Sequence, residues 1–381
     1  MKIKTITCHD VYNYGSSLQA YALMKCLEDF GHDVEIINYK PYYLTTRYNF
    51  WYIEGQSRYR DLCNKSKFIH LLYALKNYPV RYKTIGRKSP FDQFRNKYLK
   101  ITDRRYATNE ELKTNPPTAD LFITGSDQVW NSVMLLGRDP AFFLDFVPEG
   151  FMRASYASSF GESSIVESYK SFTRVMLEKL SHISVRETTG LKILKTIDIK
   201  NAIQALDPVF LLSRQQWESI IKKEHTEKYL LVYDFIHDPA IEQAARKIAA
   251  EKGWKIYSIN DERELSYAHK NISNAGPLEF MEFIKSSQMV ISNSFHGTAF
   301  SIIFEKEFYV FNLATLNNSS RMSDLLSLVD LSHRHISSKE QMQLTERIDY
   351  SKVKQRLYVH RAHSYSYLDK VLKMNITTPN P

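Results

Sequence analysis

The chain has 381 residues and a formal net charge of +9, with 43% hydrophobic and 24% charged residues. This length predicts two domains of roughly 150–200 residues each, and the composition is that of an ordinary globular protein. It excludes a membrane-spanning helix, because no apolar run reaches ~18–20 residues, and a disulfide framework or zinc cluster, because the three cysteines are scattered. The N-terminal residues lack the apolar core of a signal peptide, so we expect a cytoplasmic protein. We also expect that the protein uses no cofactor.

The first residues predict a βαβ unit. A strand over 2–8 is followed by a loop through Gly15 and by a helix over 16–30 whose apolar residues recur on one face. Gly31 stands where a left-handed C-cap belongs, and a second strand begins at Val34. Strands and helices that alternate in this way are typical of a parallel sheet.

An α-helical insertion is expected over residues 51–105. Its residues 57–105 contain fourteen Lys and Arg against three Asp and Glu, and they are rich in Tyr and Phe. Two interpretations stay open for this segment. It is either a solvated face, or a docking face for an acidic glycan, a lipid-linked diphosphate or nucleic acid. No nucleic-acid-binding motif is present, so we expect no nucleic acid partner, whereas a peripheral contact with the inner face of the membrane stays open.

The middle of the chain completes the first domain. A strand over 121–124 precedes the loop GSDQVWN, and the segment SYASSFG leads to a helix near 165–180 and a short strand in HISVRE. The Asp-Pro pair that begins at Asp207 marks the start of the second domain. We therefore assign residues 1–205 to an N-terminal Rossmann-like domain.

The same alternation returns after residue 206. It predicts strands over 228–235, 254–259, 288–293 and 308–312, and helices over 239–252, 278–286 and 297–305, with Gly253 as a helix cap. We assign residues 206–349 to a second, donor-binding Rossmann-like domain and 350–381 to a helical tail that packs back on the first. The predicted fold class is α/β, with two open, mostly parallel sheets.

Three loops are candidates for a binding site. Ligands of open parallel sheets bind beyond the carboxyl ends of the strands, where loops lead into helices. Residues 12–16, 125–128 and 294–298 occupy such places. If the two sheets face each other, we expect these loops to meet in one interdomain cleft.

His296 lies at a predicted strand-to-helix elbow, in the stretch SNSFHGTAF. Gly297 is expected to permit a tight turn there, beside free backbone N–H groups and the positive end of the helix. This environment attracts phosphate or carboxylate groups. A ligand role and a purely structural role both stay open for a single histidine.

Six stretches form an ordered set between about residues 1 and 330: NYGSSLQAYAL, LFITGSDQVWN, SYASSFG, ISVRE, LDPVFLL and VISNSFHGTAFSIIF. With these stretches the chain resembles the polysaccharide pyruvyl transferase family. The resemblance implies a GT-B-like fold, in which two Rossmann-like domains face each other across a cleft. It also implies transfer of a pyruvyl group from phosphoenolpyruvate (PEP) to a sugar, as a cyclic ketal. The sugar would belong to a surface polysaccharide, in exopolysaccharide or capsule biosynthesis, or to its lipid-linked oligosaccharide precursor.

The resemblance also implies a donor site. The family pattern of an arginine in the VRE stretch and a histidine before a glycine falls on Arg186 and His296. Many members carry an arginine at the position of Ser294, and Arg321 is a candidate replacement for it. PEP presents a phosphate and a carboxylate, which need cationic or N–H-rich groups. We expect its ligands to be Arg186, Arg321, Ser294, Gly297 and Thr298.

Two residues are candidates for catalysis. Histidine is suited to carry protons near neutral pH, and His296 is therefore the first candidate. Asp127 is the second candidate, as a base or a hydrogen-bond acceptor for the sugar. A structural role stays open for it, as a helix cap or an Asx-turn residue. Many family members have Gly-Asp where this chain has Gly15-Ser16. We expect the acceptor to contact Asn13, Gly15, Ser16, Gly125, Ser126 and Gln128, whereas Trp130 either stacks on a sugar or packs in the core.

Two other clusters are rejected as sites. Cys8, His9 and Asp10 have the residue types of a nucleophile triad, but neighbours along a strand point to opposite faces. His360 and His363 lack a third metal ligand nearby. Two rival functions stay open: a nucleotide-sugar glycosyltransferase on the same fold, and a non-catalytic glycan-binding or assembly protein.

Overall fold

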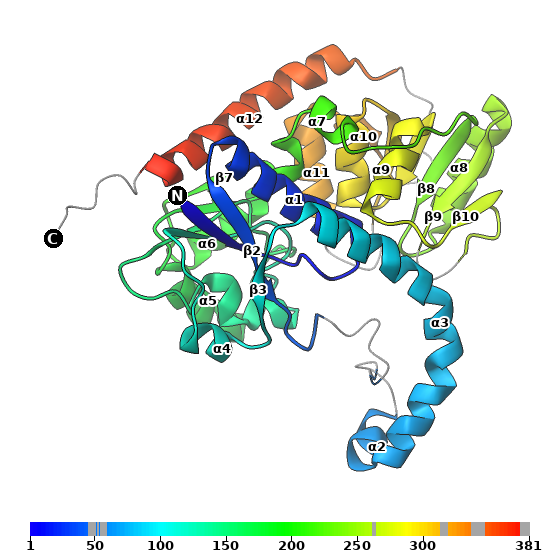
Figure 1. Cartoon of the computed structure of the whole chain (residues 1–381). Coiled ribbons are helices and arrows are strands. Elements are labelled where there is room, and N and C mark those ends of the chain that lie inside the picture. The colour runs from blue at the N-terminus through cyan, green and yellow to red at the C-terminus, as the bar shows by residue number, and fades with distance from the viewer. Residues whose placement is uncertain are drawn as a thin grey trace.

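The computed structural model describes residues 1–44, 51, 53, 59–260, 264–312, 319–336 and 347–373. It contains two parallel sheets, each flanked by helices, and a long helix that projects from them (Figure 1). Parts of the expected insertion and of the C-terminal tail lie outside the described residues. Within the described part, no helix is both long and apolar enough to cross a membrane.

The first sheet has the strand order β3-β2-β1-β4-β5, and all of its pairs are parallel. A parallel pair, β6-β7, continues it, because a bridge between Ala154 and His182 joins β5 to β6. The strands span Lys2–Ile6 (β1), Asp33–Tyr39 (β2), Ile101–Tyr106 (β3), Leu121–Thr124 (β4), Met152–Ser155 (β5), Ile183–Val185 (β6) and Ala202–Gln204 (β7).

The second sheet repeats this arrangement, with the order β10-β9-β8-β11-β12-β13. Its strands span Tyr229–Tyr233 (β8), Lys255–Ile259 (β9), Lys270–Ile272 (β10), Met289–Ser292 (β11), Glu307–Phe311 (β12) and His335–Ile336 (β13). In both sheets the first strand lies between the second and the fourth, so the connections diverge on either side of it. This is the topological switch point of a Rossmann-like fold, where ligands bind.

Helices cover both faces of each sheet. They span Tyr14–Asp29 (α1), Asn109–Thr114 (α4), Lys170–Leu177 (α5), Thr188–Thr196 (α6), Arg214–Glu218 (α7), Pro239–Lys252 (α8), Pro277–Ser286 (α9), Phe295–Ile303 (α10) and Ser319–Leu328 (α11). The central strands are accordingly buried along their whole length, as in the YLLVY run of β8. Helix α8 has the predicted bounds, and Gly253 adopts the left-handed cap conformation with a φ of 64°.

The prediction of a helical insertion over 51–105 is wrong at its C-terminal end, where the structure has strand β3. Helices α2 (Arg60–Lys65) and α3 (Lys67–Tyr98) fall within it, but β3 is an edge strand of the first sheet and pairs with β2. The last turns of α3 also belong to the body of the protein. The Phe91 ring stacks on Tyr14 of α1 at 5.3 Å, and Tyr14 stacks on Phe280 of α9 at 4.6 Å. Helix α3 therefore packs between the two domains.

The last helix, α12 (Tyr350–Lys373), runs from the second domain back over the first (Figure 1). The Tyr367 hydroxyl donates a hydrogen bond to the Ser155 carbonyl oxygen of β5, at 2.7 Å. The Ser364 hydroxyl accepts one from the backbone N–H of Leu206, at 3.0 Å, in the segment that joins the domains. Both contacts are buried, so the helix fastens the two halves together.

Replacing Ser364 with alanine is expected to lower the free energy of unfolding by about 1–3 kcal/mol, because the buried Leu206 N–H loses its acceptor. Ser366→Ala is the matched control, since this serine lies on the same helix and is exposed. Denaturant unfolding of both variants measures the difference. Equal stabilities of the two variants would contradict the role of this hydrogen bond.

Candidate active site between the two sheets

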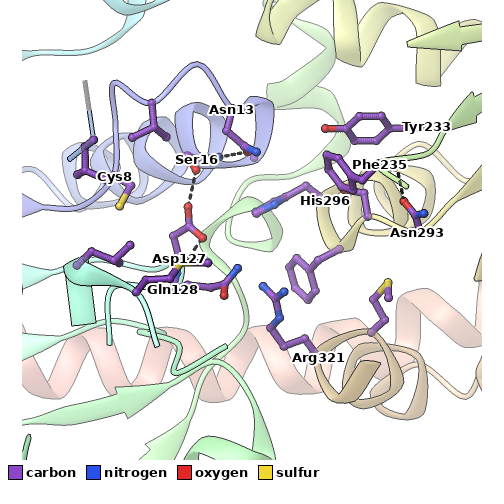
Figure 2. Close-up of a pocket in the computed structure, with 18 residues that line it drawn as sticks. Cys8, Asn13, Ser16, Asp127, Gln128, Tyr233, Phe235, Asn293, His296 and Arg321 are labelled. Carbon is purple, nitrogen blue, oxygen red and sulfur yellow. Dashed lines mark hydrogen bonds between the residues drawn. The ribbon is translucent and has the colours of Figure 1, made fainter. Parts of the chain in front are cut away.

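A pocket of about 350 Å³ lies between the domains (Figure 2). Its walls come from the segments that follow β1 and β4 in the first sheet and β8 and β11 in the second, with α11 closing one side. The two switch points therefore face each other, and all three loops predicted to meet contribute to the pocket. Of the expected site residues, those that line it are Asn13, Gly15, Ser16, Asp127, Gln128, Ser294, His296 and Arg321.

His296 lies in the first turn of α10, which begins at Phe295 and not at Gly297. The Ser294 hydroxyl caps this helix by accepting a hydrogen bond from the Gly297 N–H, at 3.3 Å. Gly297 makes no left-handed turn; a Cβ there would lie 2.8 Å from the Ser292 Oγ, so the glycine lets α10 approach β11. The predicted tight turn is therefore wrong.

Thr298 and Gly297 do not suit the expected role of donor ligands. The Thr298 side chain is buried and donates to the Ser294 carbonyl oxygen, at 2.9 Å. The Gly297 N–H is already bound by the cap. Only the N–H groups at the very start of α10, at Phe295 and His296, precede this capped position.

Gly15 and His296 form a close contact between the two domains. Gly15 lies in the first turn of α1, which Asn13 caps by accepting from the Ser16 N–H at 3.1 Å. A Cβ on Gly15 would lie 1.9 Å from His296 Nδ1, so any other residue would displace the ring. The sequence suggested that Gly15 admits a ligand; in the structure it admits the imidazole.

Asp207 lies behind His296 and was not identified as a site residue from the sequence. Its Oδ2 lies 3.6 Å from His296 Nε2 and accepts hydrogen bonds from Arg186 Nη1 at 2.8 Å and Ser126 Oγ at 3.1 Å. Burial would raise the pKa of Asp207, but the neighbouring His296 and Arg186 outweigh it and hold this pKa well below its usual range. A carboxylate thus faces one nitrogen of the imidazole, which orients the ring.

Arg186 does not reach the pocket. Its buried guanidinium donates to Glu187 Oε1 at 3.0 Å and to Asp207, and it lies over the Phe295 ring at 4.4 Å. Burial would lower the pKa of Arg186, but the two carboxylates outweigh it and raise this pKa. The structure thus places Arg186 as a support for Asp207 and Phe295, rather than as the direct donor ligand expected from the sequence.

Arg321 is in a different situation. It lies near the start of α11, and its guanidinium points toward the ring of His296 (Figure 2). Among the described residues, no carboxylate forms an ion pair with it, and its buried Nε has no hydrogen-bond partner. Burial, and then the charge of Arg186, lower the pKa of Arg321. A cation without a counterion at the wall of an open pocket favours an anionic ligand.

Asp127 lies opposite, on the first-domain wall. It adopts a φ of 80°, and its carboxylate accepts hydrogen bonds from the Ser16 hydroxyl and, at 2.8 Å, from the Gln128 N–H. The carboxylate therefore stabilises its own loop and still lines the pocket. Gly125 and Ser126 lie behind this wall, so they do not have the acceptor contacts expected of them.

Aromatic side chains form the wall of the second domain. Tyr233 is the last residue of β8 and Phe235 follows the strand; their ring centroids are 4.7 Å apart, and Phe235 is 45% exposed. These residues were missed from the sequence, where they continue the apolar run of a buried strand. Trp130, in contrast, is a core residue, because its indole N–H donates to the Phe142 carbonyl oxygen at 3.1 Å and its ring is buried.

The two rejected clusters do not form sites. Burial, followed by the charge of Asp127, raises the pKa of the Cys8 thiol well above its usual range, so no thiolate is available. Burial lowers the pKa of His9 to about 4, and Asp10 is paired with Lys40 and Arg95. Among the described residues, no group of three side chains is arranged to bind a metal ion.

Comparison with known proteins adds the family. The model of a family described as polysaccharide pyruvyl transferase matches residues 13–314. No curated protein matches the chain.

Three solved structures are similar over almost their whole length. The S. aureus MnaA-UDP co-structure has 11% identity and a TM-score of 0.51, and the match covers 100% of this chain and 98% of that one. UDP-GlcNAc 2-epimerase from Neisseria meningitidis bound to UDP-GlcNAc has 10% identity and a TM-score of 0.48, covering 98% and 100%. E. coli heptosyltransferase WaaC with ADP has 9% identity and a TM-score of 0.41, covering 94% and 100%. At such identities the likeness to MnaA shows the fold alone, and the predicted fold class is confirmed.

Asp207→Asn is expected to lower the free energy of unfolding by about 3 kcal/mol at neutral pH, because the buried Arg186 loses a counterion. The pKa of Asp207 is depressed in the folded state, so its contribution is complete above its unfolded pKa of about 3.9 and is lost as the pH falls below it. The stability gap between wild type and variant should therefore narrow on acidification below about pH 4.

Urea unfolding over a pH series measures this gap. The control is Asp198→Asn, at an exposed aspartate, for which we expect a change within about 0.5 kcal/mol. A gap that stays constant down to pH values of about 3 would show that Asp207 is not the titrating group.

Proposed function

The chain belongs to the polysaccharide pyruvyl transferase family, and we propose that it transfers a pyruvyl group from PEP to a sugar hydroxyl pair, closing a cyclic ketal. The sugar would belong to a surface polysaccharide or to its lipid-linked precursor. The observation that supports an anionic donor is the guanidinium of Arg321, which forms no ion pair within the described part of the chain and lines the same pocket as His296. The mechanism below is derived from the residues that surround these two.

PEP carries a phosphate and a carboxylate, and the pocket offers two positive groups for them. Arg321 supplies a guanidinium, which suits either acid group through paired N–H donors. The start of α10, at Phe295 and His296, supplies the positive end of a helix. Ser294, where many family members have an arginine, is used as the cap of this helix. Arg321 therefore takes over the charge that position 294 lacks.

The reaction needs three changes at the donor. The methylene carbon of PEP gains a proton, the adjacent carbon forms two C–O bonds to the sugar, and its bond to the phosphate oxygen breaks. The two sugar hydroxyls release two protons, of which one balances the new methyl group and the other leaves with the phosphate. Proton transfers of this kind need a group that both takes and gives a proton near neutral pH.

His296 is placed for this role. The Asp207 carboxylate faces its Nε2, which favours a proton on that nitrogen and leaves Nδ1 beside Gly15 to exchange protons. Asp127 lies on the opposite wall, where its carboxylate would accept the proton or hydrogen bond of a sugar hydroxyl. Its hydrogen bond with Ser16 brings a carboxylate to the place where many members carry Gly-Asp.

The sugar would lie between the two walls. Asn13, Ser16 and Gln128 offer polar groups on the first-domain side. The partly exposed Phe235 ring, next to Tyr233, offers an apolar face against which a sugar ring can pack.

Phosphate release tests this function directly. Purified protein is incubated with PEP and a panel of free and lipid-linked galactosides and mannosides. Thermal-shift measurements with PEP, UDP and GDP distinguish pyruvyl transfer from nucleotide-sugar chemistry. Nucleotide-sugar chemistry is the alternative to test because the similar MnaA structure contains UDP. Stabilisation by UDP or GDP but not by PEP would contradict the proposal, and so would glycan binding without phosphate release.

His296→Ala is expected to lower the rate of phosphate release by roughly 10²–10⁴-fold, because the proton carrier is lost. His363→Ala is the matched control, since this histidine is exposed on α12. Circular dichroism checks that both variants keep the fold. Turnover at the wild-type rate in a folded His296→Ala protein would refute the assignment.

Arg321→Ala is expected to have two effects of opposite sign. The KM for PEP should rise by roughly 10–100-fold, because a charge-assisted hydrogen bond to the donor is lost. The ligand-free protein should become more stable, because the variant removes a partly buried cation that forms no ion pair among the described residues and whose pKa burial lowers. Steady-state kinetics and thermal unfolding measure the two effects. Arg246→Ala, on the exposed face of α8, is the control, and an unchanged KM in Arg321→Ala would exclude donor binding by Arg321.

A further inference from the structure

The N-terminal part of α3 carries a large apolar surface that nothing in the described chain covers. We define the arm as α2 together with residues 67–85 of α3; it projects away from the two domains (Figure 1). Phe68 is 68% exposed and Leu75 is 53% exposed. Among the side chains of α3 in the arm that the structure describes, the exposed large apolar ones are Phe68, Leu71, Leu72, Leu75, Tyr78, Tyr82 and Ile85.

These seven side chains, defined here as the apolar stripe, lie on one face of the helix. They follow each other at spacings of one, three and four residues, and at 3.6 residues per turn they cover roughly 140° of the circumference. The opposite face of α3 is already occupied, because the Tyr73 ring contacts Tyr59 at the start of α2, and Ala74, which borders the stripe, is fully buried. The stripe is therefore not the internal core of the arm.

Positive charge accompanies the stripe. Lys67 is exposed four residues before Leu71, and Lys76 is exposed four residues after Leu72, so each cation lies beside the apolar face. Residues 59–85 contain six Lys and Arg against one Asp. An exposed apolar stripe with cations along it is the pattern of a helix that lies in the interface of an anionic membrane.

We propose that the arm docks on the surface of an anionic lipid bilayer, with the apolar stripe at the level of the acyl chains and the lysines among the headgroups. Anionic headgroups attract each nearby lysine or arginine, and burial of the stripe removes apolar surface from water. A second copy of the chain suits this face less well, because it would bring together two arms of the same charge. Nucleic acid would satisfy the cations but leave the leucines in water.

The arm is connected to the pocket through the same helix. Phe91, further along α3, stacks on Tyr14, which lies between Asn13 and Gly15 of the pocket wall. A docked arm would therefore hold the pocket in a fixed relation to the lipid surface. The docking proposal does not rest on the proposed function, because the stripe and its lysines are separate from the pocket residues.

Co-sedimentation of the full chain with vesicles tests the proposal. We expect binding to phosphatidylcholine vesicles that contain phosphatidylglycerol, little binding to phosphatidylcholine alone, and weaker binding at high salt. Two double variants, Leu72→Ser with Leu75→Ser and Lys67→Glu with Lys76→Glu, should each reduce vesicle partitioning by roughly tenfold or more.

Matched controls distinguish the arm from the surface in general. Val175→Ser with Val359→Ser replaces two apolar residues of similar exposure on α5 and α12. Lys192→Glu with Lys195→Glu reverses two exposed lysines on α6. Both controls should bind vesicles like the wild type.

Three results would overturn the proposal. One is a wild-type protein that does not bind anionic vesicles. Another is vesicle binding that both arm variants leave unchanged. The third is a wild-type protein that does not bind vesicles and instead forms a dimer, measured by light scattering, or retains nucleic acid, if the arm variants lose this property.

Discussion

The candidate site depends on the contacts of one buried carboxylate, that of Asp207. It lies in the segment that joins the domains, accepts hydrogen bonds from Arg186 and Ser126 of the first domain, and faces His296 of the second. A charge buried this deeply is tolerated because Arg186 compensates it, and removing one partner would leave the other uncompensated. One carboxylate thereby contacts groups of both halves, and Gly15 adds a further contact between the halves by leaving room for the His296 ring.

The two arginines near the site show how partners determine a role. Arg186 has two carboxylate partners and lies over an aromatic ring, so its charge is compensated within the protein. Arg321 has no carboxylate partner among the described residues and points into the pocket, so its charge is left for a ligand. The proposed preference of the pocket for an anion therefore rests on which arginine has carboxylate partners, and the number of arginines alone would not reveal it.

Most elements were predictable because they depend on local patterns. Strand β4 and helix α8 have the predicted bounds, since an apolar run buried on both faces and a helix between an aspartate and a capping glycine are recognisable in isolation. Strand β3 was missed because three of the six residues in ITDRRY are charged side chains at the edge of the sheet. The role of Asp207 was also missed, and glycine at 297 was predicted for a tight turn instead of for the close approach of α10 to β11. Both depend on partners that only the folded chain brings close, and no spacing along the sequence marks them.

The proposed donor in the pocket and the proposed lipid surface on the arm would be bound in two physically different ways. In the pocket the charge is the partly buried guanidinium of Arg321, which water screens less than it screens an exposed side chain. The arm uses exposed lysines beside an apolar stripe, where salt screens the attraction and apolar burial supplies the rest. The two sites are separate, because none of the residues that line the pocket lies within residues 57–105, the segment that contains the arm and carries a net charge larger than that of the whole chain. A general attraction of anions to the protein surface would therefore act on the arm, whereas selection of a small doubly charged donor depends on the geometry around Arg321 and His296.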